Sequence, residues 1–151
     1  MKKIATLTAA AALLAIAVTP EALSQPGPQR RGAGWGYGSS YVRNYDPKTV
    51  QTVSGQVVTV GKFKPEKGAG PGIHLMLKTE KESIPVHLGP ALYVENQEST
   101  IEAGDKIEVK GSRITFQEKP AIIAAEVKKG DEVLKLRDEA GTPMWAGWRR
   151  R

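Results

Sequence analysis

His74 and His87, the two histidines of the sequence, are the residues best suited to chemistry. They lie in the segment 73–88, where apolar residues alternate with other types on both sides of a polar turn at 79–82. This period indicates an antiparallel hairpin. In such a hairpin His74 lies directly opposite His87, and a Cβ separation of about 4.5–5.5 Å lets two imidazoles share one metal ion. Met76 projects from the same face.

A donor set of histidine and methionine without cysteine suits Cu(I) or Ag(I). The sequence therefore predicts a soft-metal site at His74, His87 and Met76, over which Met144 and Trp145 could fold. The same histidines have a simpler interpretation, as ordinary solvated side chains on an exposed sheet face. In both interpretations the opposite face of the hairpin is aliphatic and points into the core. Its residues are Ile73, Leu75, Leu77, Ile84, Val86 and Leu88.

A second candidate site is basic and aromatic. Three of its lysines fall in the Gly/Pro-rich segment 61–72, which predicts an exposed loop. The candidate ligand-binding residues are Lys62, Lys64, Lys67, Tyr93, Trp145, Trp148 and Arg149. Lysines beside aromatic rings suit nucleic acid or another polyanion, and they are equally typical of a solvated surface that supports solubility.

Catalytic motifs are absent from the sequence. It contains no cysteine, no Gly-x-Ser-x-Gly sequence and no His-Glu-x-x-His sequence. Its closely spaced glycines at 32–38 neither follow a strand nor open a helix, which excludes a dinucleotide-binding loop. We therefore expect a protein that binds or adapts and is not an enzyme.

The N-terminal residues predict export. Lys2 and Lys3 precede an apolar, Ala/Leu-rich run over 4–18, and Ala22-Leu23-Ser24 offers small residues for cleavage before Gln25. The run is too short to favour a spanning helix, so we expect a periplasmic protein that is not integral to the membrane. Cleavage removes two lysines and one glutamate from a chain of net charge +6, which leaves +5. Export also disfavours nucleic acid as the natural ligand.

The remaining chain divides into an arm, one domain and a tail. Residues 25–45 are rich in Gly, Pro, Arg and aromatics and predict a flexible arm, because closely spaced glycines are costly to order. Residues 46–145 form the domain, and residues 146–151 a basic tail. The arm and tail offer basic and aromatic groups to a partner.

Four segments besides the hairpin have strand character: 49–60, 106–109, 121–128 and 132–137. The first is β-branched, with Gly55 at a bend. In the third, Ile123, Ala125 and Val127 are expected on one face. A short helix follows the hairpin, with Pro90 at its first position. In the hairpin itself, the register that pairs the two histidines also pairs Ile73 with Leu88.

This element order resembles the OB-fold, a small closed Greek-key barrel. The resemblance covers about residues 50–127 and includes the sequence Ile101-x-x-Gly104-Asp105-x-Ile107-x-Val109-x-Gly111. It implies an all-β, OB-fold-like closed Greek-key barrel of five to six strands, with one short helix between the third and fourth strands.

Together with the export signal, the chain resembles periplasmic OB-fold proteins of bacteria, which include stress-related proteins and small copper and silver chaperones. The resemblance implies a monomeric, non-catalytic binding or adaptor module for an envelope protein or an anionic ligand. The alternatives are a Cu or Ag carrier and a nucleic-acid or polyanion binder.

Overall fold

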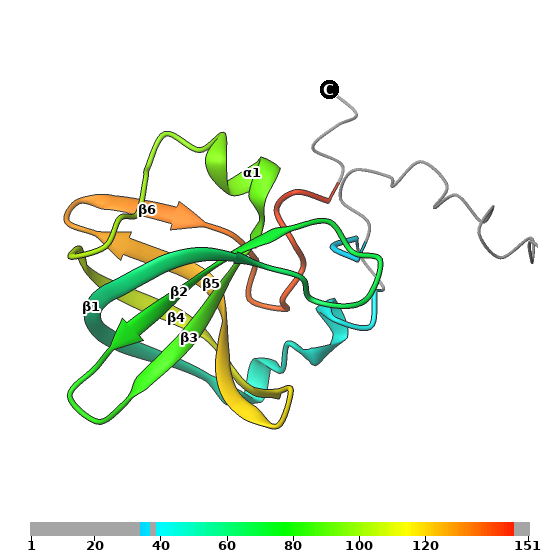
Figure 1. Cartoon of the computed structure of the whole chain (residues 1–151), viewed down its shortest axis with the longest axis horizontal. Coiled ribbons are helices and arrows are strands. Elements are labelled where there is room, and N and C mark those ends of the chain that lie inside the picture. Colours follow the sequence, from blue (N-terminus) through cyan, green and yellow to red (C-terminus); the bar gives the residue numbers. More distant parts are fainter. Residues whose placement is uncertain (1–33, 37–38, 147–151) are drawn as a thin grey trace, which may run out of the picture.

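The computed structural model describes residues 34–36 and 39–146 (Figure 1). The predicted signal peptide, the first part of the arm and most of the basic tail lie outside the described residues. Trp148 and Arg149, two of the predicted contact residues, lie outside them as well. The described helices and strands are η2 (Val42–Asn44), η3 (Pro47–Thr49), β1 (Val50–Phe63), β2 (Gly72–Lys78), β3 (Ser83–Pro90), α1 (Ala91–Glu95), β4 (Lys106–Phe116), β5 (Lys119–Lys129) and β6 (Glu132–Lys135).

The six strands form one sheet in the order β3-β2-β1-β4-β5-β6, and successive neighbours are antiparallel. A further, parallel pairing joins β3 to β5, with Val86 opposite Ile122 and His87 opposite Ile123. This pairing bonds the sheet into a ring. The prediction of an all-β protein with a helix between its third and fourth strands is confirmed. Pro90 precedes α1 as its N-cap instead of occupying its first position.

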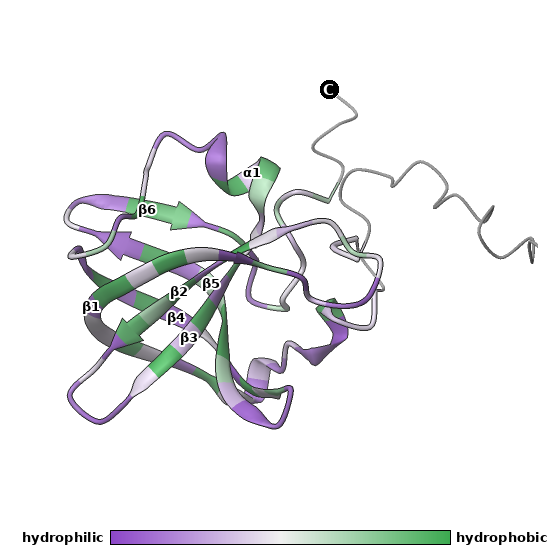
Figure 2. Cartoon of the chain, viewed as in Figure 1, coloured by the Kyte–Doolittle hydropathy of each residue, from purple (hydrophilic) through white to green (hydrophobic). Residues whose placement is uncertain are grey.

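The hairpin of β2 and β3 has the predicted register through His74 and His87. Beyond them a β-bulge places Ile73 opposite Gly89, so the predicted pairing of Ile73 with Leu88 is wrong. The bulge adds one residue to β3, and both aliphatic side chains stay buried. The alternation of apolar and polar residues along the strands is visible as green and purple bands (Figure 2).

β1 is longer than predicted, and its β-bulge lies between Val57 and Thr59, whereas the sequence predicted a bend at Gly55. It pairs with β4 up to Gln56 and with β2 from Gln56 onward, so it changes partner next to Gly55. A Cβ atom at Gly55 would overlap the carbonyl oxygen of Lys78, which explains the glycine. Because β1 continues to Phe63, Lys62 lies in a strand and not in a loop.

β4 and β5 are also longer than predicted. β4 continues past Gly111 to Phe116, and Gly111 is paired with both β1 and β5. The register shift between Lys110 and Gly111 leaves Ala125 of β5 as the extra residue. β5 is buried on both faces along much of its length. Ile123 and Ala125 face one hydrophobic cluster and Val127 another, so the prediction that these three share a face is wrong.

Two hydrophobic clusters therefore hold the fold together. The first is built mainly from the aliphatic faces of the strands, including Leu75, Leu77 and Val86. The second combines Ile123 and Ala125 with three aromatic residues of the N-terminal segment, Trp35, Tyr41 and Tyr45. These three side chains are 0%, 2% and 8% exposed. The prediction of a flexible arm is thus wrong for its described residues, because burial of large aromatic rings offsets the entropy cost of the glycines.

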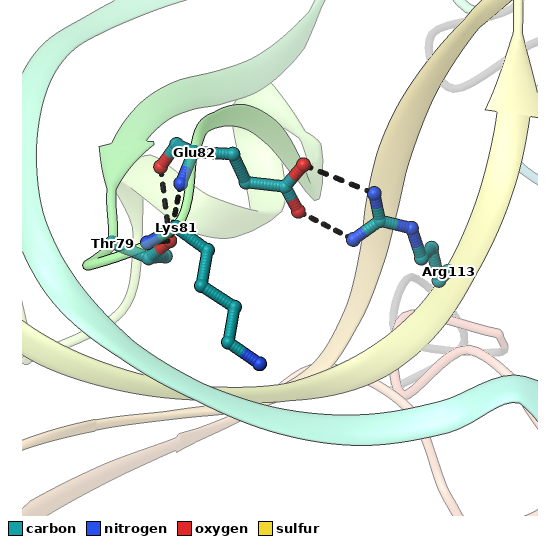
Figure 3. A network of polar contacts seen from close by, with 4 residues as sticks. All are labelled: Thr79, Lys81, Glu82 and Arg113. Carbon is teal, nitrogen blue, oxygen red and sulfur yellow. Dashed lines mark hydrogen bonds and ion pairs between the residues drawn. The ribbon is translucent and has the colours of Figure 1, made fainter.

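A bidentate ion pair ties the tip of the β2–β3 hairpin to β4 (Figure 3). Arg113 Nη1 donates to Glu82 Oε1 at 2.5 Å, and Nη2 donates to Oε2 at 3.1 Å. In the turn itself, Thr79 Oγ1 accepts from the backbone amides of Lys81 and Glu82 and donates to the carbonyl oxygen of Glu82. The turn therefore holds Glu82 in place for Arg113.

The ion pair predicts how acid affects stability. The hydrogen bond from Arg113 lowers the pKa of Glu82. A carboxylate with a lowered folded-state pKa stabilises the fold above its unfolded pKa of about 4.3, and this contribution is lost as the pH falls through the folded pKa. We expect wild type to be more resistant to urea than Glu82→Gln at pH 7, and the difference to disappear in acid. Glu80→Gln, an exposed change in the same turn, is the control; an equal effect there would contradict the assignment.

Candidate functional site

The two histidines lie opposite each other as predicted, but an aromatic ring packs against both. The ring centroids of His74 and His87 are 6.4 Å apart. Phe63, from β1, stacks on His74 at 5.1 Å and contacts His87 at 4.2 Å. The three rings form one packed cluster, in which Phe63 contacts both imidazoles.

His87 is buried, although the sequence predicted both imidazoles on an exposed sheet face. His87 is only 2% exposed, whereas His74 is half-buried. The N-terminal segment causes the difference, because the Tyr41 hydroxyl lies 2.7 Å from His87 Nδ1 in a hydrogen bond. Phe116, from β4, packs on the same imidazole at 4.8 Å. The prediction of an exposed pair is therefore wrong for His87.

Burial determines the charge of this cluster. Desolvation, with smaller contributions from the charges of His74 and Arg137, lowers the pKa of His87 to about 3. Desolvation also lowers the pKa of His74 and raises that of the Tyr41 hydroxyl. Both members of the Tyr41–His87 hydrogen bond are therefore neutral at pH 7.

We expect His87 to make the protein sensitive to mild acid. Its folded-state pKa of about 3 lies below the unfolded value of about 6.5, so the unfolded chain binds the proton first as the pH falls. Stability should therefore fall between pH 6.5 and pH 4, by about 3 kcal/mol from this group. Urea unfolding of wild type and His87→Gln measures the difference. The pKa of His74 is also lowered, so His74→Gln is the comparison and should reduce the slope less than His87→Gln does. A wild-type slope in His87→Gln would refute the prediction.

The predicted metal donors are only partly assembled. Met76 is half-buried on β2, two residues from His74 and on the same face, opposite Pro85. Met144 instead lines a cavity of about 450 Å³ with Tyr45 and Arg137. Among residues 34–36 and 39–146, no group of three or more His, Cys, Asp or Glu side chains could hold a metal ion. Two imidazoles and one thioether are thus the donors available at this hairpin.

The predicted lysines are exposed and lie at the end of β1 and in the segment that follows. Lys62 Nζ is 3.5 Å from Glu95 Oε1 of α1, and both side chains are more than half exposed. Lys64 and Lys67 are exposed as well. Glu66, between Lys64 and Lys67, accepts a hydrogen bond from the hydroxyl of Ser40 in the N-terminal segment.

Of the three predicted aromatic contact residues, the two that the structure describes pack against the first hydrophobic cluster, Tyr93 buried and Trp145 half-buried. Tyr93 is 9% exposed and its ring lies 5.4 Å from that of Trp145. Trp145 Nε1 donates to the carbonyl oxygen of Trp35 at 2.7 Å, and the two indoles are in edge contact. Tyr93 and Trp145 therefore contribute to the packing of the fold.

Sequence reasoning missed Arg137, a buried cation that joins three parts of the fold. The β3–β5 pairing ends at His87 and Ile123, and the next residue of each strand presents a carbonyl to Arg137. Nη1 donates to Leu88 O at 3.0 Å and also to Ala124 O. Its Cζ lies 4.8 Å from the Trp145 ring. Burial lowers its pKa to about 10, so it remains charged at pH 7.

One accessible combination of apolar and basic side chains remains at the predicted site. We define the outer strip as Phe63, His74 and Met76, which are half-buried on β1 and β2. Exposed Lys62 and Lys64 flank Phe63 in sequence, and exposed Lys67 lies in the segment that follows β1. The strip can bind a ligand by apolar and stacking contacts, and the lysines can attract negative charge.

The family model described as the MamS/MamX magnetosome protein family matches residues 49–134, more than half of the 151-residue chain. The match begins at the residue before β1 and ends inside β6. No curated protein matches the chain in sequence. In the part of the chain that the structure describes, no helix has the length and apolar character needed to cross a membrane.

Proposed function

The chain belongs to the MamS/MamX magnetosome protein family, and from that premise we propose that it is an exported, non-catalytic binding or adaptor module acting at the magnetosome. The outer strip, bordered by Lys64 and Lys67, is its contact surface. The ligand is a protein or another anionic component of that compartment. The N-terminal sequence of Lys2, Lys3 and an apolar run supports the proposal of export.

The proposed scaffold is an OB-like barrel. The pairings give the cyclic order β1-β2-β3-β5-β4, and α1 stands between β3 and β4. That order and helix position suit a five-stranded Greek-key barrel, with β6 as an addition to β5. Because one fold hosts many functions, the proposed activity rests on the surface and not on the barrel.

The observation that carries the proposal is the stacked, half-buried pair of Phe63 and His74, with exposed Lys62 and Lys64 on either side of Phe63 in the sequence. Aromatic side chains left partly accessible next to positive charge are typical of contact surfaces. Phe63 also packs against Trp35 and Tyr41, so its inner side helps to hold the N-terminal segment in place. The proposal concerns the side of the outer strip that stays accessible.

Retention on isolated magnetosomes tests the proposal. A tagged full chain should be recovered with magnetosomes, and its mature N-terminus should be Gln25. Lys64→Gln combined with Lys67→Gln and Met76→Thr should lower retention severalfold in low salt. Lys110→Gln with Lys135→Gln, two exposed lysines of β4 and β6, is the matched control for charge. Equal loss in the control, or no recovery of wild type, would refute the proposal.

Soft-metal transport by His74, His87 and Met76 is the alternative, and we infer that the pair is mainly structural. The Tyr41 hydroxyl occupies Nδ1 of His87, and Phe63 packs on both imidazoles. Titration with Cu(I), Ag(I) or Zn(II) should therefore leave the NMR signals of the His87 ring unchanged at one equivalent. A stoichiometric shift of both imidazoles would restore the carrier function.

A further inference from the structure

Among the described residues, no strand lies beside the second half of β1 on the edge that faces away from β2. β4 pairs with β1 only from Val50 to Gln56, and β2 occupies the other edge from Gln56 to Phe63. The last backbone hydrogen bonds on the open edge join Val57 to Gly104 and Asp105. We define the open edge as residues 58–63; within the described part of the chain, none of the backbone hydrogen bonds outside the ladders involves it.

The open edge is also apolar and exposed. Val58 is 49% exposed and Val60 is 40% exposed, and Thr59 between them is exposed too. β-branched residues favour an extended backbone, so this segment is already in the conformation that accepts another strand. A bulge between Val57 and Thr59 and the charge of Lys62 are the protective features present here. β6, the other edge strand, is only four residues long.

Charge indicates what kind of strand would bind. Lys62, Lys64 and Lys67 lie at the C-terminal end of the open edge and just beyond it. Glu95 is the acidic group within ion-pair distance of Lys62, and that pair is exposed and therefore weak. A second copy would bring two chains of net charge +6 together. An acidic segment from another protein is favoured instead.

We propose that the open edge binds an extended, acidic peptide segment of a partner protein by strand addition. The segment lies antiparallel to β1, so that its N-terminal acidic residues face Lys62 and Lys64 and its apolar side chains contact Val58 and Val60. Main-chain hydrogen bonds provide affinity, and the charges fix direction. This inference rests on the proposed binding function, and it names the partner's chemistry and the edge that takes it.

A synthetic peptide with two N-terminal glutamates followed by alternating valine and threonine is the probe. With the full mature chain, we expect slower amide hydrogen exchange at residues 58–63 and NMR shifts confined to β1 and its neighbours. The same peptide methylated on alternate amide nitrogens keeps its side chains and loses ladder hydrogen bonds. Its affinity should fall about tenfold or more, since each lost bond contributes to binding.

Variants of the chain separate strand addition from charge attraction. Lys64→Gln with Lys67→Gln should weaken the acidic peptide severalfold and reduce its salt dependence, whereas Lys110→Gln with Lys135→Gln should not. A Kd of about 1 mM corresponds to a binding free energy of about −4 kcal/mol. If about 1 mM peptide leaves the amide exchange of residues 58–63 unchanged, the proposal is overturned. Equal affinity for the methylated peptide would overturn it too.

The oligomeric state of the chain distinguishes a second copy from an acidic partner as the occupant of the open edge. Self-association that protects residues 58–63 without peptide would identify a second copy as the occupant and refute the acidic partner. If the peptide fails while magnetosome retention still depends on Lys64, Lys67 and Met76, the proposed function stands and the assignment of the edge falls. If retention fails and the peptide still protects the edge, strand addition stands without the proposed function.

Discussion

Replacing Arg137 with methionine should lower the free energy of unfolding by about 3 kcal/mol, because two carbonyl oxygens lose a charged donor and the Trp145 ring loses a stacked cation. Leu88 O and Ala124 O lie where β3 and β5 separate, so the guanidinium replaces the strand pairing that ends there. The same substitution removes a costly buried charge, which limits the net loss.

Arg137→Lys tests whether the planar guanidinium matters or only the charge. A lysine keeps the cation but loses the planar guanidinium that lies over the Trp145 ring, so we expect an intermediate loss. Lys135→Met is the matched control, because Lys135 is exposed on β6 and two residues away. Denaturant unfolding measures all three. If Arg137→Met is as stable as wild type, the guanidinium does not contribute to holding β3 and β5 together.

The second large effect is expected at Trp35. Trp35→Ala should cost about 3–5 kcal/mol, the usual range for a fully buried tryptophan. Its indole is 0% exposed, donates from Nε1 to Gly70 O at 3.0 Å and packs against Tyr41 and Phe63. Gly72 leaves room for the ring, since a Cβ atom there would overlap it.

This loss should be accompanied by exposure of the second cluster. In Trp35→Ala, amide exchange should increase at Tyr41 and Tyr45 more than in β2, because the N-terminal segment loses its largest anchor. Val58→Ala, a change at a residue 49% exposed, is the control and should stay within about 0.5 kcal/mol of wild type. A Trp35→Ala protein as stable as that control would show that the segment is not part of the fold.

Local patterns in the sequence were enough to predict the strands. The hairpin of β2 and β3 alternates strictly, so its faces and the pairing of His74 with His87 could be predicted from period and turn alone. The helix followed from the change of period after Leu88. The ends of β1 and β4 could not be predicted, because Gly61 and Gly111, which interrupt the alternation, are paired within the ladders with residues distant in the sequence.

Contacts between distant parts of the chain explain what was missed at the site. Trp35 and Tyr41 stand among glycines, a composition typical of linkers, and their burial depends on a sheet face formed much later in the chain. The aromatic content of that segment was the available signal. Arg137 had no such signal, because its partners are main-chain carbonyls of two other strands, which no side-chain pattern reveals.

The N-terminal segment covers the sheet at His87, so that this imidazole is buried and serves the packing of the fold. NMR titration of the two imidazoles from pH 8 to pH 3 tests it directly. We expect His74 to protonate first, with a pKa below its usual value, and His87 to stay neutral until about pH 3. If both rings titrate together near pH 6.5, the value of free imidazoles, His87 is solvated and the N-terminal segment does not cover it.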